Sequence, residues 1–281
     1  MCRSVLRPMN LPASLVTIRC EIQNRSSVSK VMQNNIKPNW QDFYEMCKPR
    51  VVLLMLLCTL AGMFLATDDM VPLATISFCL LGVALVSGSA AALNHLVDAS
   101  VDAKMARTHN RPVAQGRVSN FQGGVFVAIT LALGMAILMV FINSLTAWLN
   151  LAAWAGYGIF YSVYLKRATS QNIVIGGLFG AAPPLFGWTA VTNSIDGGGL
   201  LLVLIIFVWT PPHFWALAID RIEEYKLVEY PMLPVTHGEA YTRLQILLYT
   251  IVLVLITLLP YIIGMSNLLY LAAAVALGAG F

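Results

Sequence analysis

Residues 91–112 have the sequence AALNHLVDASVDAKMARTHNRP and complete the apolar run of residues 71–93. Within this stretch, Asn94, Asp98 and Asp102 are spaced four residues apart. On a helix this spacing places the three side chains near one face. The stretch therefore predicts a membrane helix that continues beyond its apolar part and presents two carboxylates and an amide oxygen at its polar end.

A basic run follows directly, with four cations at Lys104, Arg107, Arg111 and Arg117. Carboxylates near a bilayer are costly and usually functional. Magnesium takes oxygen ligands, typically one or two carboxylates together with substrate phosphates. We therefore expect Asn94, Asp98 and Asp102 to bind a magnesium-bridged diphosphate, with Arg107 and Arg111 as further substrate-binding residues. The alternative is an ordinary solvated loop whose acids balance the nearby arginines.

The composition indicates an all-α polytopic membrane protein. Of the 281 residues, 58% are hydrophobic and 11% are charged, whereas soluble domains carry about 25% charged residues. The net charge of +4 is divided among loops rather than gathered in one patch, which argues against a nucleic-acid partner. The five cysteines show no CxxC or metal-type spacing, so we interpret those in apolar segments as packing residues.

Residues 1–45 form a polar N-terminal extension that we expect to be poorly ordered, ahead of a transmembrane domain at residues 46–281. The first thirty residues are rich in arginine and serine and contain one acid, Glu21, which is typical of a mitochondrial transit peptide. We favour the other interpretation, an unordered tail or an extension ahead of a start at Met32.

Eight apolar segments follow, and a span needs about 20 apolar residues. They cover roughly residues 50–67, 71–93, 121–142, 145–165, 172–191, 198–219, 244–264 and 267–281. The last one stops at Phe281 without a polar flank, from which we expect a truncated C-terminus.

The charges indicate the orientation of these spans. With eight spans, all eleven Lys and Arg after residue 47 fall on one side of the membrane, and the opposite loops contain none. The positive-inside rule makes the basic side cytoplasmic, or matrix-facing in a mitochondrion. We expect a multi-pass protein of the bacterial inner membrane with its site on the cytoplasmic side; the alternative is the mitochondrial inner membrane.

A second acidic cluster lies at the end of the sixth span, on the same side. Asp220 and Glu224 are again four residues apart. Two acidic clusters facing one compartment could close around a single diphosphate through metal ions, because metals neutralise developing negative charge. The alternative is a juxtamembrane acidic patch with salt bridges to Arg221 and Lys226.

A third cluster, residues 161–172, follows the fourth span. Lys166 and Arg167 could hold phosphate oxygens, with Tyr164 and Asn172 as further substrate-binding candidates. The alternative is simple positive-inside anchoring.

Two histidines are candidates for contact with a metalloporphyrin. His95 lies inside the first acidic site, and His213 follows Pro211 and Pro212 within the sixth span. We expect this proline pair to break the helix and free its carbonyls. The favoured alternative for His213 is a hydrogen-bonded core histidine. Glycine-rich stretches at residues 82–91 and 176–184 predict close helix packing or the walls of a channel.

The chain resembles the protohaem IX farnesyltransferases (haem O synthases), a family of the intramembrane aromatic prenyltransferase superfamily. The resemblance begins at about Met46 and is strongest in NHLVDASVDAKMARTHNRPVAQGR, YLKRATSQNIVIGGLFGAAPPLFGW and PPHFWALAIDRIEEYKLVEYPMLPVTHG. The family's first motif falls on Asn94, Asp98 and Asp102. Its second acidic motif usually ends in Asp before Tyr, whereas Glu224 stands there in this chain.

The resemblance implies nine transmembrane helices around a central cavity. It also implies farnesyl transfer from farnesyl diphosphate to a vinyl group of haem B, giving haem O with Mg²⁺ as cofactor. The implied partners are the lipid bilayer, farnesyl diphosphate, haem, and the next haem-modifying enzyme or oxidase assembly factors. Three rival functions remain: a prenyltransferase acting on a quinone precursor such as 4-hydroxybenzoate, an ion-coupled transporter, and a haem-binding assembly protein without catalysis.

Overall fold

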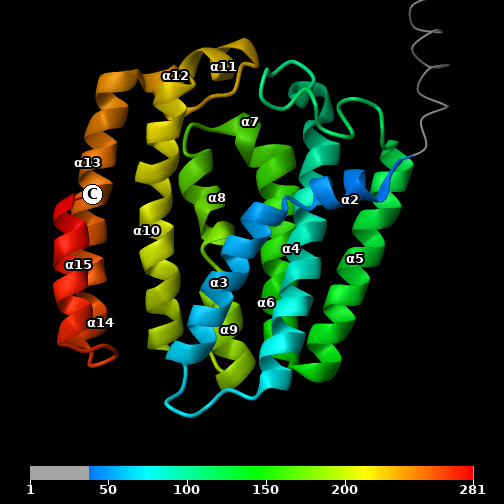
Figure 1. The fold of residues 1–281 in the computed structure, drawn as a ribbon. Helices are drawn as coiled ribbons and strands as arrows, with labels where there is room; N and C mark the ends of the chain where they lie inside the picture. The colour runs from blue at the N-terminus through cyan, green and yellow to red at the C-terminus, as the bar shows by residue number, and fades with distance from the viewer. Residues whose placement is uncertain (1–37, 281) are drawn as a thin grey trace, which may run out of the picture.

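The computed structural model describes residues 38–280, and all regular elements in that range are helices. In chain order they are α2 (Trp40–Met46), α3 (Pro49–Leu65), α4 (Leu73–Asp102), α5 (Asn120–Phe141), α6 (Ser144–Ala155), η1 (Gly156–Leu165), α7 (Lys166–Ala168), α8 (Asn172–Gly180), α9 (Pro183–Thr192), α10 (Gly197–Asp220), α11 (Ile222–Leu227), α12 (Leu233–His237), α13 (Glu239–Thr257), α14 (Leu259–Ile262) and α15 (Leu268–Gly280). The long helices lie side by side in one bundle (Figure 1). The predicted extension lies mostly outside the described residues, and α2 occupies its last part.

Each of the eight predicted apolar segments is helical, but the count of eight spans is not confirmed. By length and composition, five helical stretches can cross a membrane: Leu73–Asp102, Asn120–Phe141, Asn172–Thr192, Gly197–Asp220 and Glu239–Ile262. The pair α2 and α3, bent by 52°, would make a sixth. The helix α15 is apolar but shorter.

The helix α4 is longer than a membrane span requires. Its 30 residues correspond to about 45 Å at 1.5 Å per residue, whereas the hydrocarbon core is about 30 Å thick. Its first twenty residues are sufficient to cross that core. The last turns, from Asn94 to Asp102, therefore extend toward the polar boundary, as the sequence predicted.

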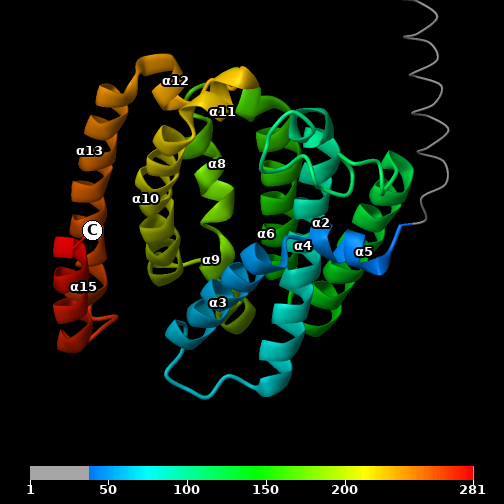
Figure 2. The same cartoon turned by 45° about the horizontal axis from the view of Figure 1, so that its top comes forward.

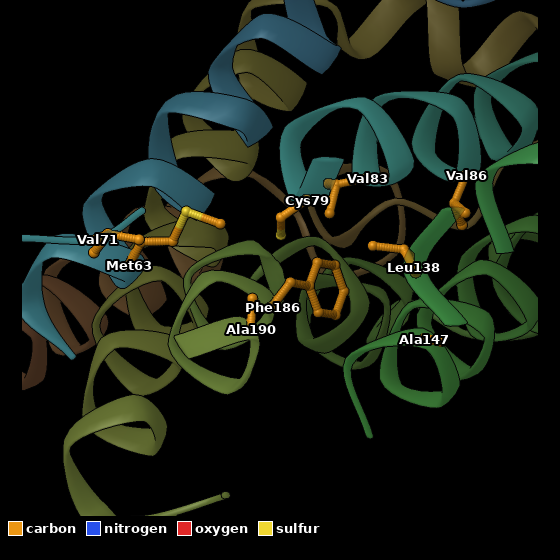
Figure 3. Close-up of a cluster of buried hydrophobic side chains, with 9 residues drawn as sticks. All are labelled: Met63, Val71, Cys79, Val83, Val86, Leu138, Ala147, Phe186 and Ala190. Carbon is orange, nitrogen blue, oxygen red and sulfur yellow. The ribbon is translucent and has the colours of Figure 1, made fainter. Parts of the chain in front are cut away.

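One of three buried apolar clusters lies toward the end of the bundle opposite these turns. Met63 of α3, Val83 of α4, Leu138 of α5 and Phe186 of α9 are among the side chains that meet there (Figure 3). The helices α3 and α9 pack backbone to backbone, because a Cβ atom at Gly187 would lie 1.8 Å from the carbonyl oxygen of Thr59. Small residues at helix contacts allow this close approach in membranes.

The chain segments that carry the predicted site residues gather at one end of the bundle. The loop after α4, the short helix α7 and the helices α11 and α12 all lie there (Figure 1). Turning that end toward the viewer shows the same grouping (Figure 2). Residues far apart in the sequence therefore meet above the polar end of α4.

Candidate active site

The predicted triplet lies on the last turns of α4 and is buried. Asn94, Asp98 and Asp102 are 4%, 2% and 4% exposed, respectively. The helix continues to Asp102, so the four-residue spacing aligns the three side chains as expected. The C-terminal end of a helix carries partial negative charge, which disfavours carboxylates there. Buried acids in this position therefore need cations close by.

Three donors from three parts of the chain hold the carboxylate of Asp98. Its Oδ2 accepts hydrogen bonds from Asn94 Nδ2 at 2.8 Å and from Lys166 Nζ at 2.7 Å. Its Oδ1 accepts from the Tyr230 hydroxyl at 3.3 Å. The ion pair with Lys166 compensates both the burial of Asp98 and the helix dipole.

The loop after α4 folds back onto Asp102. Arg111 Nη1 lies 2.7 Å from Asp102 Oδ2, and the Thr108 hydroxyl donates to the Asp102 carbonyl at 3.2 Å. Arg117 instead pairs with Asp42 on α2. Lys104 and Arg107 are exposed and form no ion pair within the described range. Of the predicted basic run, only Arg111 is ion-paired with a carboxylate of the triplet.

Lys48 is a site residue that the sequence did not reveal. It precedes α3 and adopts a left-handed backbone conformation, with φ 51° and ψ 62°, which is uncommon for a residue other than glycine. Its Nζ donates to Asn94 Oδ1 at 2.6 Å. The sequence showed Lys48 only as one of the eleven Lys and Arg residues on one side of the membrane. No local feature links it to Asn94, which lies 46 residues further along the chain.

A π-helix supplies the next wall of the site. In η1, the Ser162 hydroxyl donates to the Tyr157 carbonyl five residues earlier at 2.8 Å and accepts from Asn94 Nδ2 at 3.2 Å. The rings of Tyr157 and Tyr161 stack with centroids 5.6 Å apart. Short π-helical segments occur frequently at functional sites, and here the segment brings Ser162 and the following Lys166 to the α4 triplet.

Tyr230 enters the site from the loop between α11 and α12. It is 3% exposed and packs with Ile173, Trp215 and Leu233. The ammonium group of Lys166 lies 4.8 Å from the centre of its ring, a cation–π arrangement. Burial raises the pKa of the Tyr230 phenol, and the Asp98 carboxylate raises it further. Tyr230 is therefore a neutral donor at physiological pH.

Only some residues of the third predicted cluster, residues 161–172, lie at the site. Lys166 joins the site, and buried Asn172 supports it, with Nδ2 lying 3.4 Å from the Lys166 carbonyl. Arg167 is exposed near Tyr230. Tyr164 is 64% exposed and its ring contacts Phe160, so the structure does not bring it to the carboxylates.

The second acidic cluster does not form one helical face. The helix α10 ends at exposed Asp220, and Arg221 interrupts the helix with φ −116° and ψ 26° before α11 begins. Glu224 lies on α11, and its Oε2 is buried with no hydrogen-bond partner among the described residues. The four-residue spacing of Asp220 and Glu224 therefore does not place the two side chains on one face of a continuous helix.

The two candidate histidines occupy different surroundings. His95 is 2% exposed, and neither ring nitrogen has a hydrogen-bond partner in the described part of the chain. His213 is partly buried and stacks on Trp209 with centroids 4.4 Å apart. The helix α10 continues through Pro211 and Pro212, so the predicted break is wrong. The fixed proline φ is compatible with a helix, and membrane helices tolerate the lost amide donors.

The donor set fits a magnesium ion that is bound together with substrate phosphates. Within residues 38–280, no three His, Cys, Asp or Glu side chains surround a common metal position. Magnesium needs only one or two protein carboxylates when phosphates supply the remaining oxygens. Asp98 and Asp102 provide these on adjacent turns, whereas Glu224, whose buried Oε2 has no partner among the described residues, does not complete a three-carboxylate group with them.

The family model described as UbiA prenyltransferase matches residues 55–281. The chain is 60% identical over 250 residues to a protoheme IX farnesyltransferase of Saccharophagus degradans, covering 89% of this chain and 82% of that protein. It is 59% identical over 242 residues to the protoheme IX farnesyltransferase of Teredinibacter turnerae, covering 86% and 78% of the two chains.

Solved structures share the fold at low sequence identity. A UbiA homologue from Archaeoglobus fulgidus bound to GPP and Mg²⁺ matches with a TM-score of 0.71 and 16% identity, over 85% of this chain and 83% of that chain. The apo structure of a UbiA homologue from Aeropyrum pernix K1 matches with a TM-score of 0.70 and 18% identity, over 81% and 84%. The family match and the identity to the bacterial relatives establish that this chain belongs to the UbiA prenyltransferase family.

Proposed function

We propose that this chain transfers the farnesyl group of farnesyl diphosphate to a vinyl group of haem B, giving haem O. The choice of substrates rests on the relatives, which are about 60% identical and carry the name protoheme IX farnesyltransferase. The observation that carries the chemistry is the buried triplet Asn94, Asp98 and Asp102, which is surrounded by cations at the polar end of α4.

The site has the charge that a prenyl diphosphate requires. Three basic side chains line the site: Arg111 and Lys166 each pair with a carboxylate, and Lys48 donates to Asn94. A magnesium ion held by Asp98 and Asp102 would neutralise the negative charge that develops on the departing diphosphate. Carboxylates that bind the ion would no longer need Lys166 and Arg111 as counter-charges.

The protein's own groups then stabilise the leaving group. Lys166 and Arg111 are placed to donate charge-assisted hydrogen bonds to diphosphate oxygens, and Lys48 is placed to add a third. Because these donors are held in advance by buried contacts, they stabilise developing charge without large reorganisation. Tyr230 keeps Asp98 oriented through its neutral hydroxyl.

The bond changes follow from the substrates. The C1–O bond of farnesyl diphosphate breaks, and its electron pair leaves with the diphosphate. The π electrons of the haem vinyl group form the new C–C bond, and the resulting cation takes up water and loses a proton. The stacked rings of Tyr157 and Tyr161 lie beside the triplet and would shield the allylic cation from early capture by water.

The membrane placement is part of the proposal. The one-sided distribution of Lys and Arg, which assumes eight spans, supports a site on the cytoplasmic face of a bacterial inner membrane. The two relatives named above come from bacteria, which supports this placement over the mitochondrial alternative.

The test compares two acceptor substrates in separate reactions of the purified chain in lipid nanodiscs. Farnesyl diphosphate and Mg²⁺ are supplied with haem B or with 4-hydroxybenzoate, and the products are identified by mass spectrometry. We expect hydroxyethylfarnesyl haem from the first mixture and no prenylated product from the second. Prenylation of 4-hydroxybenzoate alone would assign the chain to quinone-precursor chemistry instead.

A further inference from the structure

His95 is a buried polar side chain whose hydrogen-bonding capacity the protein does not use. It is 2% exposed, and neither Nδ1 nor Nε2 has a partner among the described residues. A neutral imidazole carries one donor and one acceptor, and buried polar groups in native proteins are nearly always paired. The ring therefore lacks a partner that a bound ligand would supply.

The position of His95 identifies the kind of ligand. It follows Asn94 on α4 and is one helical turn before Asp98, so it borders the face that carries the triplet. The charged side chains close enough to act on its ring include Lys48 and Arg111. These two cations contact Asn94 and Asp102, respectively. A His95 N–H group beside Lys48 and Arg111 can donate a hydrogen bond to an anion that these two cations also attract.

A haem iron is a poor partner for this ring. Axial ligation requires a nitrogen lone pair that faces a space wide enough for a flat macrocycle. His95 is almost fully enclosed within the bundle, next to cations that would compete with a metal ion for its lone pair. The geometry therefore favours an anionic group that enters along the face of α4.

We infer that His95 donates a hydrogen bond to an oxygen of the prenyl diphosphate, in the same subsite as Lys48 and Arg111. This role replaces the haem contact that the sequence suggested, and it rests on the proposed function of the triplet. His95 then contributes to binding the diphosphate half of the substrate and leaves the binding of the haem acceptor unchanged.

The test measures binding of magnesium pyrophosphate by calorimetry to the full chain in nanodiscs. His95→Phe removes the donor, His95→Asn keeps one, and His237→Phe changes an exposed histidine as a matched control. We expect His95→Phe to weaken binding at least tenfold, and the other two variants to stay within about threefold of the wild type. Binding by His95→Phe equal to that of the wild type would overturn the inference.

A parallel titration with haem B, followed by its Soret absorption, separates the two possible ligands. We expect the same haem spectrum and affinity for His95→Phe and the wild type. A Soret change confined to His95→Phe, with pyrophosphate binding intact, would assign His95 to haem and overturn the inference. If the wild type itself fails to bind magnesium pyrophosphate, the proposed diphosphate site fails with it.

A measurement on the unmodified protein covers the case in which His95→Phe does not fold. In protein labelled with ¹⁵N-histidine, the His95 ring resonance is assigned by its loss in His95→Asn. We expect magnesium pyrophosphate to shift this resonance while the His237 resonance stays in place. A His95 resonance that does not move at saturating pyrophosphate contradicts the inference.

Discussion

Lys166 and Asp98, 68 residues apart in the chain, form a buried ion pair with a distance of 2.7 Å between Nζ and Oδ2. The pair joins the start of α7, directly after η1, to the last turns of α4. The same ammonium group lies over the ring of Tyr230, whose hydroxyl contacts the other oxygen of Asp98. Three segments that are distant in the sequence thus meet at one carboxylate.

The contribution of Asp98 to stability, through its ion pair with Lys166, can be measured separately from its contribution to catalysis. Asp98→Asn leaves Lys166 without its counter-charge, and breaking a buried pair typically costs about 3–5 kcal/mol. We expect the double variant Asp98→Asn/Lys166→Met to recover most of the melting temperature lost in Asp98→Asn, and to form no haem O. Thermal melting and a product assay measure the two effects. Recovered activity in the double variant would contradict a catalytic role for Asp98.

Arg111 and Arg117 make a matched pair of substitutions in one loop. Arg111 contacts Asp102, whereas Arg117 contacts Asp42 on α2. We expect Arg111→Gln to raise the KM for farnesyl diphosphate about tenfold or more, because a charge-assisted hydrogen bond to phosphate is lost. Arg117→Gln should leave this KM within twofold of the wild type. Steady-state kinetics check both values, and equal effects would refute the assignment of Arg111 to the site.

Chelation should separate activity from folding. Asp98 and Asp102 are each paired with a basic side chain, so we expect the fold to be retained when a metal ion is removed. We expect EDTA to abolish haem O formation and to shift the melting temperature by less than about 2 °C, a change smaller than about 1 kcal/mol in a domain of this size. A large loss of stability on chelation would indicate a structural metal instead.

Gly176 makes room for Tyr161, whose ring lies next to the site. A Cβ atom at Gly176 would lie 2.4 Å from the ring of Tyr161, whereas one at Gly180 would meet nothing within 4 Å. We expect Gly176→Ala to destabilise the protein by about 1–3 kcal/mol, as overpacking does, and to lower activity by displacing the ring. Gly180→Ala on the same helix is the control, and melting curves together with haem O assays would show whether the two differ.

The raised pKa of Tyr230 predicts a dependence of stability on pH. Its phenol is held neutral by burial and by Asp98, whereas an unfolded tyrosine ionises near pH 10. Its contribution is fully present below about pH 10 and is lost as the pH rises toward the higher folded-state pKa. We expect Tyr230→Phe to lose less stability between pH 9 and 11 than the wild type or exposed Tyr164→Phe. Identical curves for Tyr230→Phe and the wild type would exclude this linkage.

The helices and the triplet followed from local sequence features. Hydrophobic runs placed helices at every apolar segment, and a four-residue spacing within one helix aligned Asn94, Asp98 and Asp102. Both features depend on residues that are close in the chain. Family resemblance added the substrates, which spacing alone could not provide.

The partners of the triplet did not follow from local features. Lys48, Ser162 and Tyr230 reach α4 across separations of 46, 68 and 132 residues. Such contacts depend on how the helices pack and on the π-helical register of η1, for which the sequence shows no local signal. The same packing brings Arg117 to Asp42 on α2.

The most direct test of the account is haem O formation by the purified chain and by three single variants. Asp98→Asn and Asp102→Asn change the carboxylates at the site, whereas Glu223→Gln changes an exposed acid that pairs with Lys226. Farnesyl diphosphate, Mg²⁺ and haem B are supplied, and mass spectrometry measures the product. We predict product from the wild type and Glu223→Gln, and a loss of at least 100-fold in the first two variants, about 2.7 kcal/mol of transition-state stabilisation. Near-normal product from both Asp98→Asn and Asp102→Asn would contradict the central claim that this triplet is the catalytic site.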